Sequence, residues 1–302
     1  MAANFPEIWN GRVIDNLKKA IVATWLEGIS EMAADVVTIN GGTLTEKQKI
    51  YVAATDFDVD VLINNSTYPI EVQEYEDGTI EITLDKFQTK ATSLADDDTL
   101  GASYDKIDTV TKSHTSAILD NKFNKSLHAI APSANTADTP VIQATGGPEA
   151  LEDAAGRKLL TYEDLIEAKR KCGWKGARLV LTNDHWNDLA LDRKRFGDQL
   201  VNYKSGNPAP VIAGFELHKF DDGIHPLYTA AGVKKAFGAI KEAGDTESSV
   251  IFAKSAIAKK TGATKQYFSK AENNPLTQSN LLNYRHYFIA TPYQAKKIGA
   301  IR

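Results

Sequence analysis

The hydrophobic and polar positions between Asp96 and Ala131 repeat with the period of a helix. Selected residues recur every three or four positions, the spacing that places them on one helix face. The residues of this face are Leu100, Tyr104, Ile107, Val110, His114, Ala117, Ile118, Phe123, Leu127 and Ile130. The stretch has no Pro and no Gly after Gly101, and Pro132 marks its end. We therefore expect one helix of about 28 residues, which would be about 42 Å long.

A period of two surrounds the dipeptide Asp77-Gly78, where apolar and polar residues alternate on both sides. Alternation around Asp-Gly is a strong signal of a β-hairpin. A two-stranded ribbon is marginally stable alone in water, so its apolar row must lie on a sheet of this chain or on another molecule. The expected contact residues are Ile70, Val72, Tyr75, Ile80, Ile82 and Leu84.

The first 34 residues carry another helical pattern, which includes Trp9 and Trp25. Two tryptophans on an amphipathic terminal helix indicate that the helix is docked. Packing on its own domain and docking on a neighbouring subunit both satisfy this pattern. Between residues 35 and 67 the pattern changes to short strands and turns.

A second region begins after the Pro-flanked segment 132–140. Its pattern alternates between helix and strand. Thr161 and Asp164 predict a capped helix that Gly173 closes. The further predicted elements are a strand at 178–181, a helix at 183–191, a strand at 211–220 interrupted at Gly214, an apolar run at 249–258, and two strands within 281–301.

The composition is that of a globular protein, with 42% hydrophobic and 25% charged residues among 302. We expect no transmembrane segment, because the apolar runs are shorter than the roughly 20 residues of a membrane helix, and no secretory signal. One cysteine excludes a disulfide framework and fits a reducing cytoplasm. The net charge of −4 disfavours a protein that wraps nucleic acid.

Few segments carry candidate chemistry. The segment from His218 to His225 holds two imidazoles and two carboxylates, but Asp-Asp-Gly within it is also an ordinary turn. Cys172 lies at a helix end, where the dipole opposes a thiolate, so a buried thiol is favoured. The segment 56–60 lacks the Gly and Glu of a calcium loop. We therefore expect no catalytic residue, metal or cofactor.

A spaced series of lysines follows the apolar run that begins at residue 249. Solvated positions on a strand explain this series most simply. Contact with nucleic acid or with an acidic partner is the alternative. The lysines are Lys254, Lys259, Lys260, Lys265 and Lys270.

The order of these elements resembles the tailed-phage major capsid protein family, which has the Hong Kong 97-type fold. The helix, strand and helix in 162–169 and 176–189 are similar to the start of that family's axial domain. The resemblance implies an α+β fold. Its parts would be an amino-terminal arm (1–34), an extended loop with a β-hairpin (35–95), a peripheral domain with the spine helix (96–144), a mixed α/β axial domain (145–278) and return strands of the peripheral domain (279–302).

By this resemblance the chain would form pentamers and hexamers of an icosahedral shell around double-stranded DNA, which it would bind without sequence specificity. Scaffolding, portal and decoration proteins would be its partners, and the virion, assembled in the host cytoplasm, its location. The arm pattern starts near Met1, so we expect a separate scaffold or none. Some relatives cross-link a loop lysine to a neighbour; Lys86 or Lys90 would be the amine, but no acceptor is identified.

Two alternatives stay open from the sequence. One is an encapsulin-like compartment that encloses a protein cargo. The other is a cytoplasmic α/β enzyme or ligand-binding protein that uses the segment from His218 to His225. The expected subunit contacts in the capsid interpretation are Trp9, Trp25 and the six ribbon residues named above.

Overall fold

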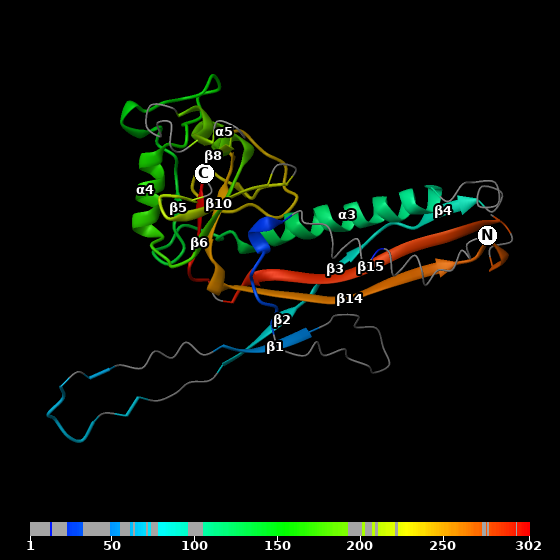
Figure 1. Ribbon diagram of the computed structural model, residues 1–302, viewed down its shortest axis with the longest axis horizontal. Coiled ribbons are helices and arrows are strands. Elements are labelled where there is room, and N and C mark those ends of the chain that lie inside the picture. The colour runs from blue at the N-terminus through cyan, green and yellow to red at the C-terminus, as the bar shows by residue number, and fades with distance from the viewer. Residues whose placement is uncertain are drawn as a thin grey trace.

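The computed structural model shows a compact part and an elongated part joined by one long helix, α3 (Asp105–Ile130) (Figure 1). The model describes residues 13, 23–32, 49–54, 61–62, 64–70, 72–73, 78–95, 105–192, 201–202, 207–208, 211–220, 223–273, 276, 278–293 and 295–302. The predicted spine helix is confirmed over its described residues. It ends two residues before Pro132, which cannot continue a helix.

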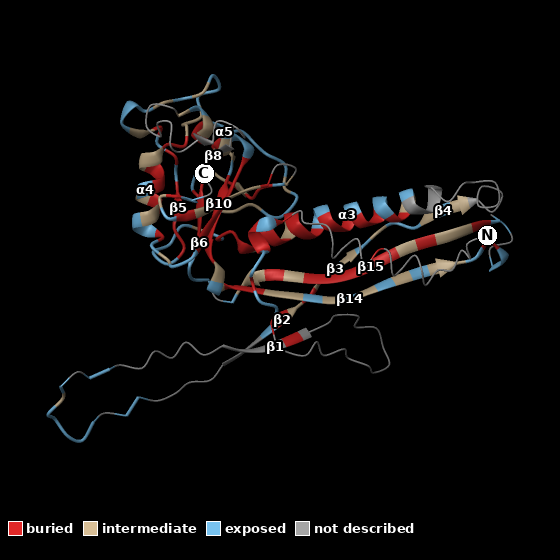
Figure 2. Ribbon diagram, in the orientation of Figure 1, coloured by how far each residue is buried: buried red, intermediate tan, exposed pale blue. Residues whose placement is uncertain are grey.

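The compact part contains a six-stranded sheet of order β5-β16-β13-β6-β10-β9. Its strands are β5 (Val141–Ile142), β16 (Ile298–Ile301), β13 (Ser249–Ala253), β6 (Ala177–Leu181), β10 (Phe215–Lys219) and β9 (Val211–Ile212). Every residue of β6, β13 and β16 is buried (Figure 2). Strands covered on both faces have continuous apolar runs, which is why their sequences do not alternate.

The two faces of this sheet have different covers. On one face, α4 (Tyr162–Lys171) and α5 (Asn183–Leu191) contribute Leu165 and Leu189 to a cluster with Leu179 and Ile251. Thr161 and Asp164 form the predicted capping box of α4. The other face packs against the carboxyl-terminal half of α3. The compact part is therefore three layers thick, and its core continues into α3.

The elongated part is a four-stranded antiparallel sheet under α3. Its strands are β14 (Ile257–Ser269), β15 (Ser279–Pro292), β3 (Asp85–Gln88) and β4 (Thr92–Ala95). Residues of β15 alternate between the two faces of the sheet. Tyr284 and Phe288 lie in clusters that include α3, whereas Tyr287 lies in a cluster with Ile82 and Leu84.

The hairpin predicted around Asp77-Gly78 pairs differently from our expectation. Strand β2 (Gly78–Thr83) pairs with β1 (Lys49–Ala54) and not with the residues just before Asp77. Ile82 is opposite Ile50, and both are buried against the face of the sheet that is remote from α3. The ribbon of β1 and β2 therefore lies on a sheet of its own chain, and the described residues between the two strands (61–62, 64–70 and 72–73) extend away from that sheet as a loop.

The remaining elements are short. They are β7 (Val201–Asn202), β8 (Asn207–Pro208), β11 (Leu227–Tyr228), β12 (Thr246–Glu247), η1 (Thr24–Leu26), η2 (Gly147–Glu149), η4 (Lys254–Ala256) and η5 (Ala271–Asn273). Strand β7 pairs with β8, and β11 with β12. The predicted break at Gly214 is a tight turn between β9 and β10, with Ala213 and Gly214 both at positive φ.

Two elements fall outside the domain boundaries expected from the resemblance. Strand β14 lies in the elongated sheet beside β15, although we placed residues up to 278 in the axial domain. Strand β16 lies in the compact sheet, although we placed 279–302 in the peripheral domain. The cause is pairing between distant segments: β16 bonds to β13 and β5, and β14 pairs with β15 along almost its whole length.

Candidate assembly surfaces

The extended loop between β1 and β2 exposes apolar side chains far from the core. Its described residues between 61 and 73 lie well away from the rest of the molecule (Figure 1). Val72 is 88% exposed and Val61 79%. Leu62, Tyr68 and Ile70 are also more than half exposed. Exposed apolar residues that cluster on a projecting segment are typical of an interaction surface.

The loop is also uniformly acidic. Residues 55–77 contain seven carboxylates and no Lys, Arg or His. These acids are Asp56, Asp58, Asp60, Glu71, Glu74, Glu76 and Asp77. A segment that is both apolar and acidic matches a surface that offers hydrophobic contact together with positive charge.

The structure separates the expected subunit-contact residues into three groups. Ile70 and Val72 are exposed on the loop, as a contact would require. Trp9, Tyr75 and the side chain of Ile80 lie outside the described residues. The others are core residues and not exposed contact residues, because their own chain buries them: Trp25, Ile82 and Leu84.

Trp25 is fully buried where η1 lies between the two parts. Its ring makes edge contacts with Phe123, Phe220 and Phe252 at centroid distances of 6.5, 6.0 and 6.2 Å. Arg178 fixes the same segment, because its guanidinium donates to the carbonyl oxygens of Trp25 at 2.7 Å and Glu27 at 2.6 Å. The two alternatives for Trp25 were packing on its own domain and docking on a neighbouring subunit. In the structure, Trp25 packs on its own chain.

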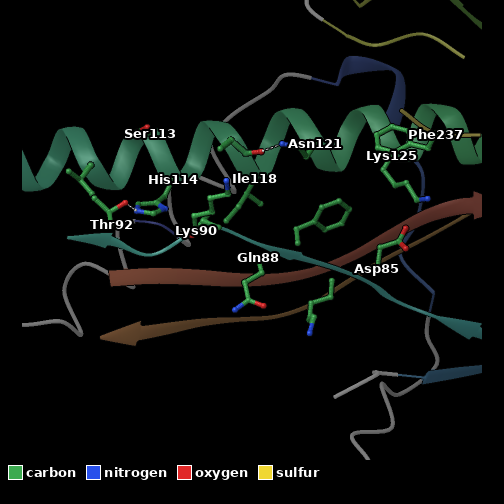
Figure 3. A pocket seen from close by; sticks show the side chains of 15 residues that line it. Asp85, Gln88, Lys90, Thr92, Ser113, His114, Ile118, Asn121, Lys125 and Phe237 are labelled. Carbon is green, nitrogen blue, oxygen red and sulfur yellow. Dashed lines mark hydrogen bonds between the residues drawn. The ribbon is translucent and has the colours of Figure 1, made fainter. Parts of the chain in front are cut away.

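A groove runs between α3 and the segment that contains β3 and β4 (Figure 3). Its volume is about 670 Å³. The apolar lining consists of Phe87, Val110, Ala117, Ile118 and Phe237. The basic lining consists of Lys86, Lys90 and Lys125. Asp85 is the one acidic side chain among the described lining residues.

The lysine side chains of the groove lie close to its apolar lining. In Figure 3 the Lys125 side chain descends from α3 toward Asp85, and Lys90 rises from the strand side toward α3. The Lys125 ammonium lies 5.2 Å from the centre of the Phe237 ring. Burial raises the pKa of the Asp85 carboxyl above its usual range, while the charge of Lys125 opposes that rise. The groove is therefore lined by three lysines against one carboxylate among the described residues.

At the far end of the groove, His114 bonds to Thr92, with 3.0 Å between Nε2 and Oγ1. Burial lowers the pKa of His114, so this imidazole is neutral at pH 7. The contact joins α3 to β4 and fixes that wall of the groove. We did not predict this site, because only the fold brings residues 85–92 next to α3. The available signal in the sequence was a pair of lysines before the predicted helix, Lys86 and Lys90, together with Lys125 within it.

The segment from His218 to His225 does not gather as a metal site in the part that the structure describes. His218 Nδ1 lies 3.1 Å from Thr24 Oγ1, and His225 Nε2 lies 3.2 Å from the carbonyl oxygen of Phe220. No group of three or more potential ligands occurs among the described residues. Asp221 and Asp222 lie outside them.

Cys172 is buried, as the sequence predicted. Burial raises the pKa of its thiol to about 12, so the thiolate is strongly disfavoured.

None of the described helices combines the length and the apolar character that a membrane crossing requires.

The lysine series divides along β14. Lys254 donates to Glu216 at 2.8 Å and Lys260 to the carbonyl oxygen of Met32 at 2.8 Å. Lys259 bonds to the carbonyl oxygen of Leu26 at 3.4 Å, whereas Lys265 and Lys270 are exposed. Lys259 and Lys260 therefore hold the amino-terminal segment in place, whereas Lys254 is paired with β10.

No family model and no curated protein sequence matches the chain. Many solved structures do match its fold, and three of them represent the kinds of particle found. The capsid of cyanophage P-SCSP1u is 14% identical, with 91% of this chain and 90% of that chain covered, at a TM-score of 0.57. A virus-like particle from Pyrococcus furiosus is 11% identical over 99% and 100%, at 0.53.

The third structure is an encapsulin complex from Synechococcus elongatus, 10% identical over 76% of each chain, at a TM-score of 0.51. At these identities the likeness concerns the fold. The order of arm segment, extended loop, spine helix and compact α/β part agrees with the expectation from the sequence. The chain thus has the Hong Kong 97-type fold of tailed-phage capsid structures.

Proposed function

We propose that this chain is the major capsid protein of a tailed phage. It assembles as pentamers and hexamers into an icosahedral shell that encloses double-stranded DNA, without sequence-specific binding and without catalysis. The observation that carries the proposal is the extended loop, which projects from a capsid-type fold and exposes apolar residues that nothing in its own described chain covers. Repeated contacts of this kind make a shell stable through many individually weak interfaces.

The shell would have further partners in this function. A scaffolding protein would guide assembly, a portal would occupy one vertex, and decoration proteins would bind the exterior. The protein would be part of the virion after assembly in the host cytoplasm. The contacts with DNA, and the charge of the surface that faces it, would be properties of the assembled shell and not of a single subunit.

An encapsulin-like compartment is the second candidate, because structures of an encapsulin complex and of a virus-like particle share the fold. The two candidates differ in contents. A phage shell would contain nucleic acid, and a compartment would contain a cargo protein. Absorbance at 260 and 280 nm and gel analysis of purified particles distinguish them.

The test is electron microscopy of the purified full chain after size-exclusion chromatography, alone and co-expressed with the neighbouring genes. We expect closed shells, tubes, or rings of five or six subunits. A chain that remains monomeric in both preparations contradicts the proposed function. Stoichiometric bound metal that is lost in a His218→Ala, His225→Ala double variant would instead support the enzyme or ligand-binding alternative.

A further inference from the structure

The elongated sheet has a basic face on the side opposite α3, which we call the remote face. The four strands of this sheet, β3, β4, β14 and β15, contain a single carboxylate, that of Asp85. Asp85 is opposite Phe288 in the register, and Phe288 packs in the cluster with α3. Residues directly opposite in a ladder share a face, so Asp85 lies on the α3 side. The strands therefore place no acidic side chain on the remote face.

The register instead gathers cations and an amide on the remote face. Lys265 of β14 and Gln88 of β3 are both opposite Arg285 of β15, so the three residues form a row across the sheet. Arg285 donates to Tyr287 Oη at 3.3 Å, and Tyr287 packs on the remote face. Figure 3 shows the Gln88 side chain pointing away from α3. Lys86 lies two residues before Gln88 and shares its face.

These polar side chains are accessible. Burial alternates along β14 and leaves Lys265 and Tyr267 exposed, and on β3 it leaves Lys86 and Gln88 exposed. Strands β1 and β2 cover the part of the remote face near Tyr287. Figure 1 shows that β14 and β15 continue well beyond them. The row is therefore on a part of the sheet that can meet another molecule.

Tyr267 adds an aromatic ring to this basic face. The Arg285 guanidinium lies 4.6 Å from the centre of the Tyr267 ring and donates to its hydroxyl oxygen. Tyr267 is 40% exposed, so one side of the ring is held and the other is open. Lys265 and Arg285 have like charges at directly opposite positions, where they repel each other. An anion bound at this face would reduce that repulsion.

The net negative charge of the chain does not oppose such binding. The seven carboxylates of residues 55–77 outweigh the net charge of −4, so the rest of the chain carries a net positive charge. The acidic residues of the loop are on a projecting segment, away from the elongated sheet (Figure 1). A local basic face can therefore attract a polyanion although the whole chain is acidic.

The composition of the remote face fits the phosphate backbone of nucleic acid. Lys, Arg, Tyr, Asn and Gln side chains all donate to phosphate oxygens, and such contacts carry no sequence information. A protein partner fits less well, because the cores of protein interfaces are apolar and depleted of charge. Of the exposed large apolar residues that the structure describes, Tyr267 is the one that lies in the strands of this sheet.

We propose that the remote face of the elongated sheet is the surface on which each subunit contacts the phosphate backbone of the packaged DNA. The inference rests on the proposed function, which supplies the DNA. Lys265 and Lys86 provide the charge, and Gln88 and Tyr267 donate hydrogen bonds to phosphate oxygens. The remote face would then point to the interior of the shell.

The direct test is binding of the purified full chain to a fluorescent DNA duplex of about 30 base pairs, measured by anisotropy at several salt concentrations. In the Lys86→Gln, Lys265→Gln double variant, the slope of log K against log salt should decrease in magnitude by about 1.8, because each lost phosphate contact removes about 0.9. At low salt its affinity should be at least about tenfold weaker than that of the wild type.

The matched control is Lys171→Gln with Lys175→Gln, which removes the same charge from two exposed positions of the compact part. Its slope and affinity should equal those of the wild type. All four lysines are exposed, so the thermal midpoint should stay unchanged in both variants and verifies that each is folded.

Assembled particles provide an independent test. Formaldehyde cross-linking of particles that contain DNA, followed by mass spectrometry, should yield nucleotide adducts at Lys265 and not at Lys175. Shells of the Lys86→Gln, Lys265→Gln variant should form normally and contain less DNA, measured by the ratio of absorbance at 260 and 280 nm.

Equal salt slopes for this variant and the wild type overturn the inference and leave the proposed function intact. A variant that forms no shells, while the control forms them, assigns the remote face to a contact between subunits and also overturns it. Loss of an acidic protein from the particles, with unchanged DNA content, does the same. A wild-type chain that forms no shell contradicts the proposed function, and with it the packaged DNA, whatever its affinity for the duplex.

Discussion

Strand β13 and the extended loop are both rich in apolar residues, but they differ in what covers them. Every residue of β13 is buried by its own chain. In the loop, Tyr68, Ile70 and Val72 are each at least half exposed. Apolar residues in the compact part therefore stabilise the monomer, whereas those of the loop can contribute only after association. Five variants test this contrast, and they are ordered by their expected effect on the stability of the monomer.

Trp25→Ala should have the largest effect. The fully buried indole contacts three aromatic rings between the compact part and α3, so its removal leaves a cavity where the core is continuous. We expect a loss of about 3–5 kcal/mol in the free energy of unfolding. Urea denaturation measures it. A loss below about 1 kcal/mol would show that η1 is not docked as described.

Ile82→Asp should cost about 2–4 kcal/mol, because a carboxylate would replace an apolar side chain that is buried with Ile50, Leu84 and Tyr287. The sequence placed Ile82 among the expected contact residues of the ribbon, where an aspartate would weaken assembly and leave the monomer soluble. The burial of Ile82 predicts a folding defect instead. Thermal denaturation of the variant monomer separates these outcomes.

His185 should make the compact part sensitive to acid. Burial lowers the pKa of this imidazole to about 4, and its Nδ1 lies 2.7 Å from Ser249 Oγ. The unfolded chain takes up a proton near pH 6.5, before the folded chain does, so the contribution of the neutral imidazole is complete above that pH. It is lost as the pH falls from about 6.5 to about 4, by on the order of 3 kcal/mol.

The measurement is the free energy of unfolding at several pH values. His185→Gln should be less stable at pH 7 and show a shallower fall below pH 6.5. An unchanged slope in the variant would assign the acid sensitivity to other groups.

Lys122→Met should stabilise the monomer by about 1 kcal/mol at pH 7. Burial lowers the pKa of this amine to about 8, so the folded chain bears the cost of a charge with little water around it. Its ammonium lies over the rings of Phe123 and Phe288, where the thioether of Met would make a favourable contact with the same rings. The wild type should gain stability as the pH rises from about 8 toward 10.5, and the variant should not.

Ile70→Asp with Val72→Asp should change the stability of the monomer by less than about 0.5 kcal/mol, because both residues are exposed. The same double variant should form no shells, since loop contacts would bury a carboxylate at each site. Thermal denaturation and electron microscopy provide the two readings. A variant that assembles like the wild type would show that the loop surface is unnecessary.

Local patterns predicted most elements of the fold. The spine helix, α4, α5, β6 and β10 lie where periodicity and caps placed them. Such elements are specified by residues a few positions apart, which a single sequence displays. The alternation around Asp77-Gly78 also identified β2 correctly as a strand.

Pairing between distant segments was not predictable in the same way. The partner of β2 is β1, about 30 residues earlier in the chain, because Ile82 and Ile50 share one hydrophobic cluster. The groove has the same origin, since Lys90 and Lys125 are brought together only when β3 and β4 pack beside α3. The sequence predicted that the apolar row of the ribbon lies on a sheet of this chain or on another molecule. Which ribbon residues their own chain buries depends on tertiary structure.

The most direct measurement is cryo-electron microscopy of particles from the wild-type chain, co-expressed with its neighbouring genes. We predict closed shells of pentamers and hexamers in which residues 61–73 of each subunit lie on an adjacent subunit and Val72 is buried. Monomers alone, or shells in which this loop is exposed to solvent at every subunit, would contradict the account.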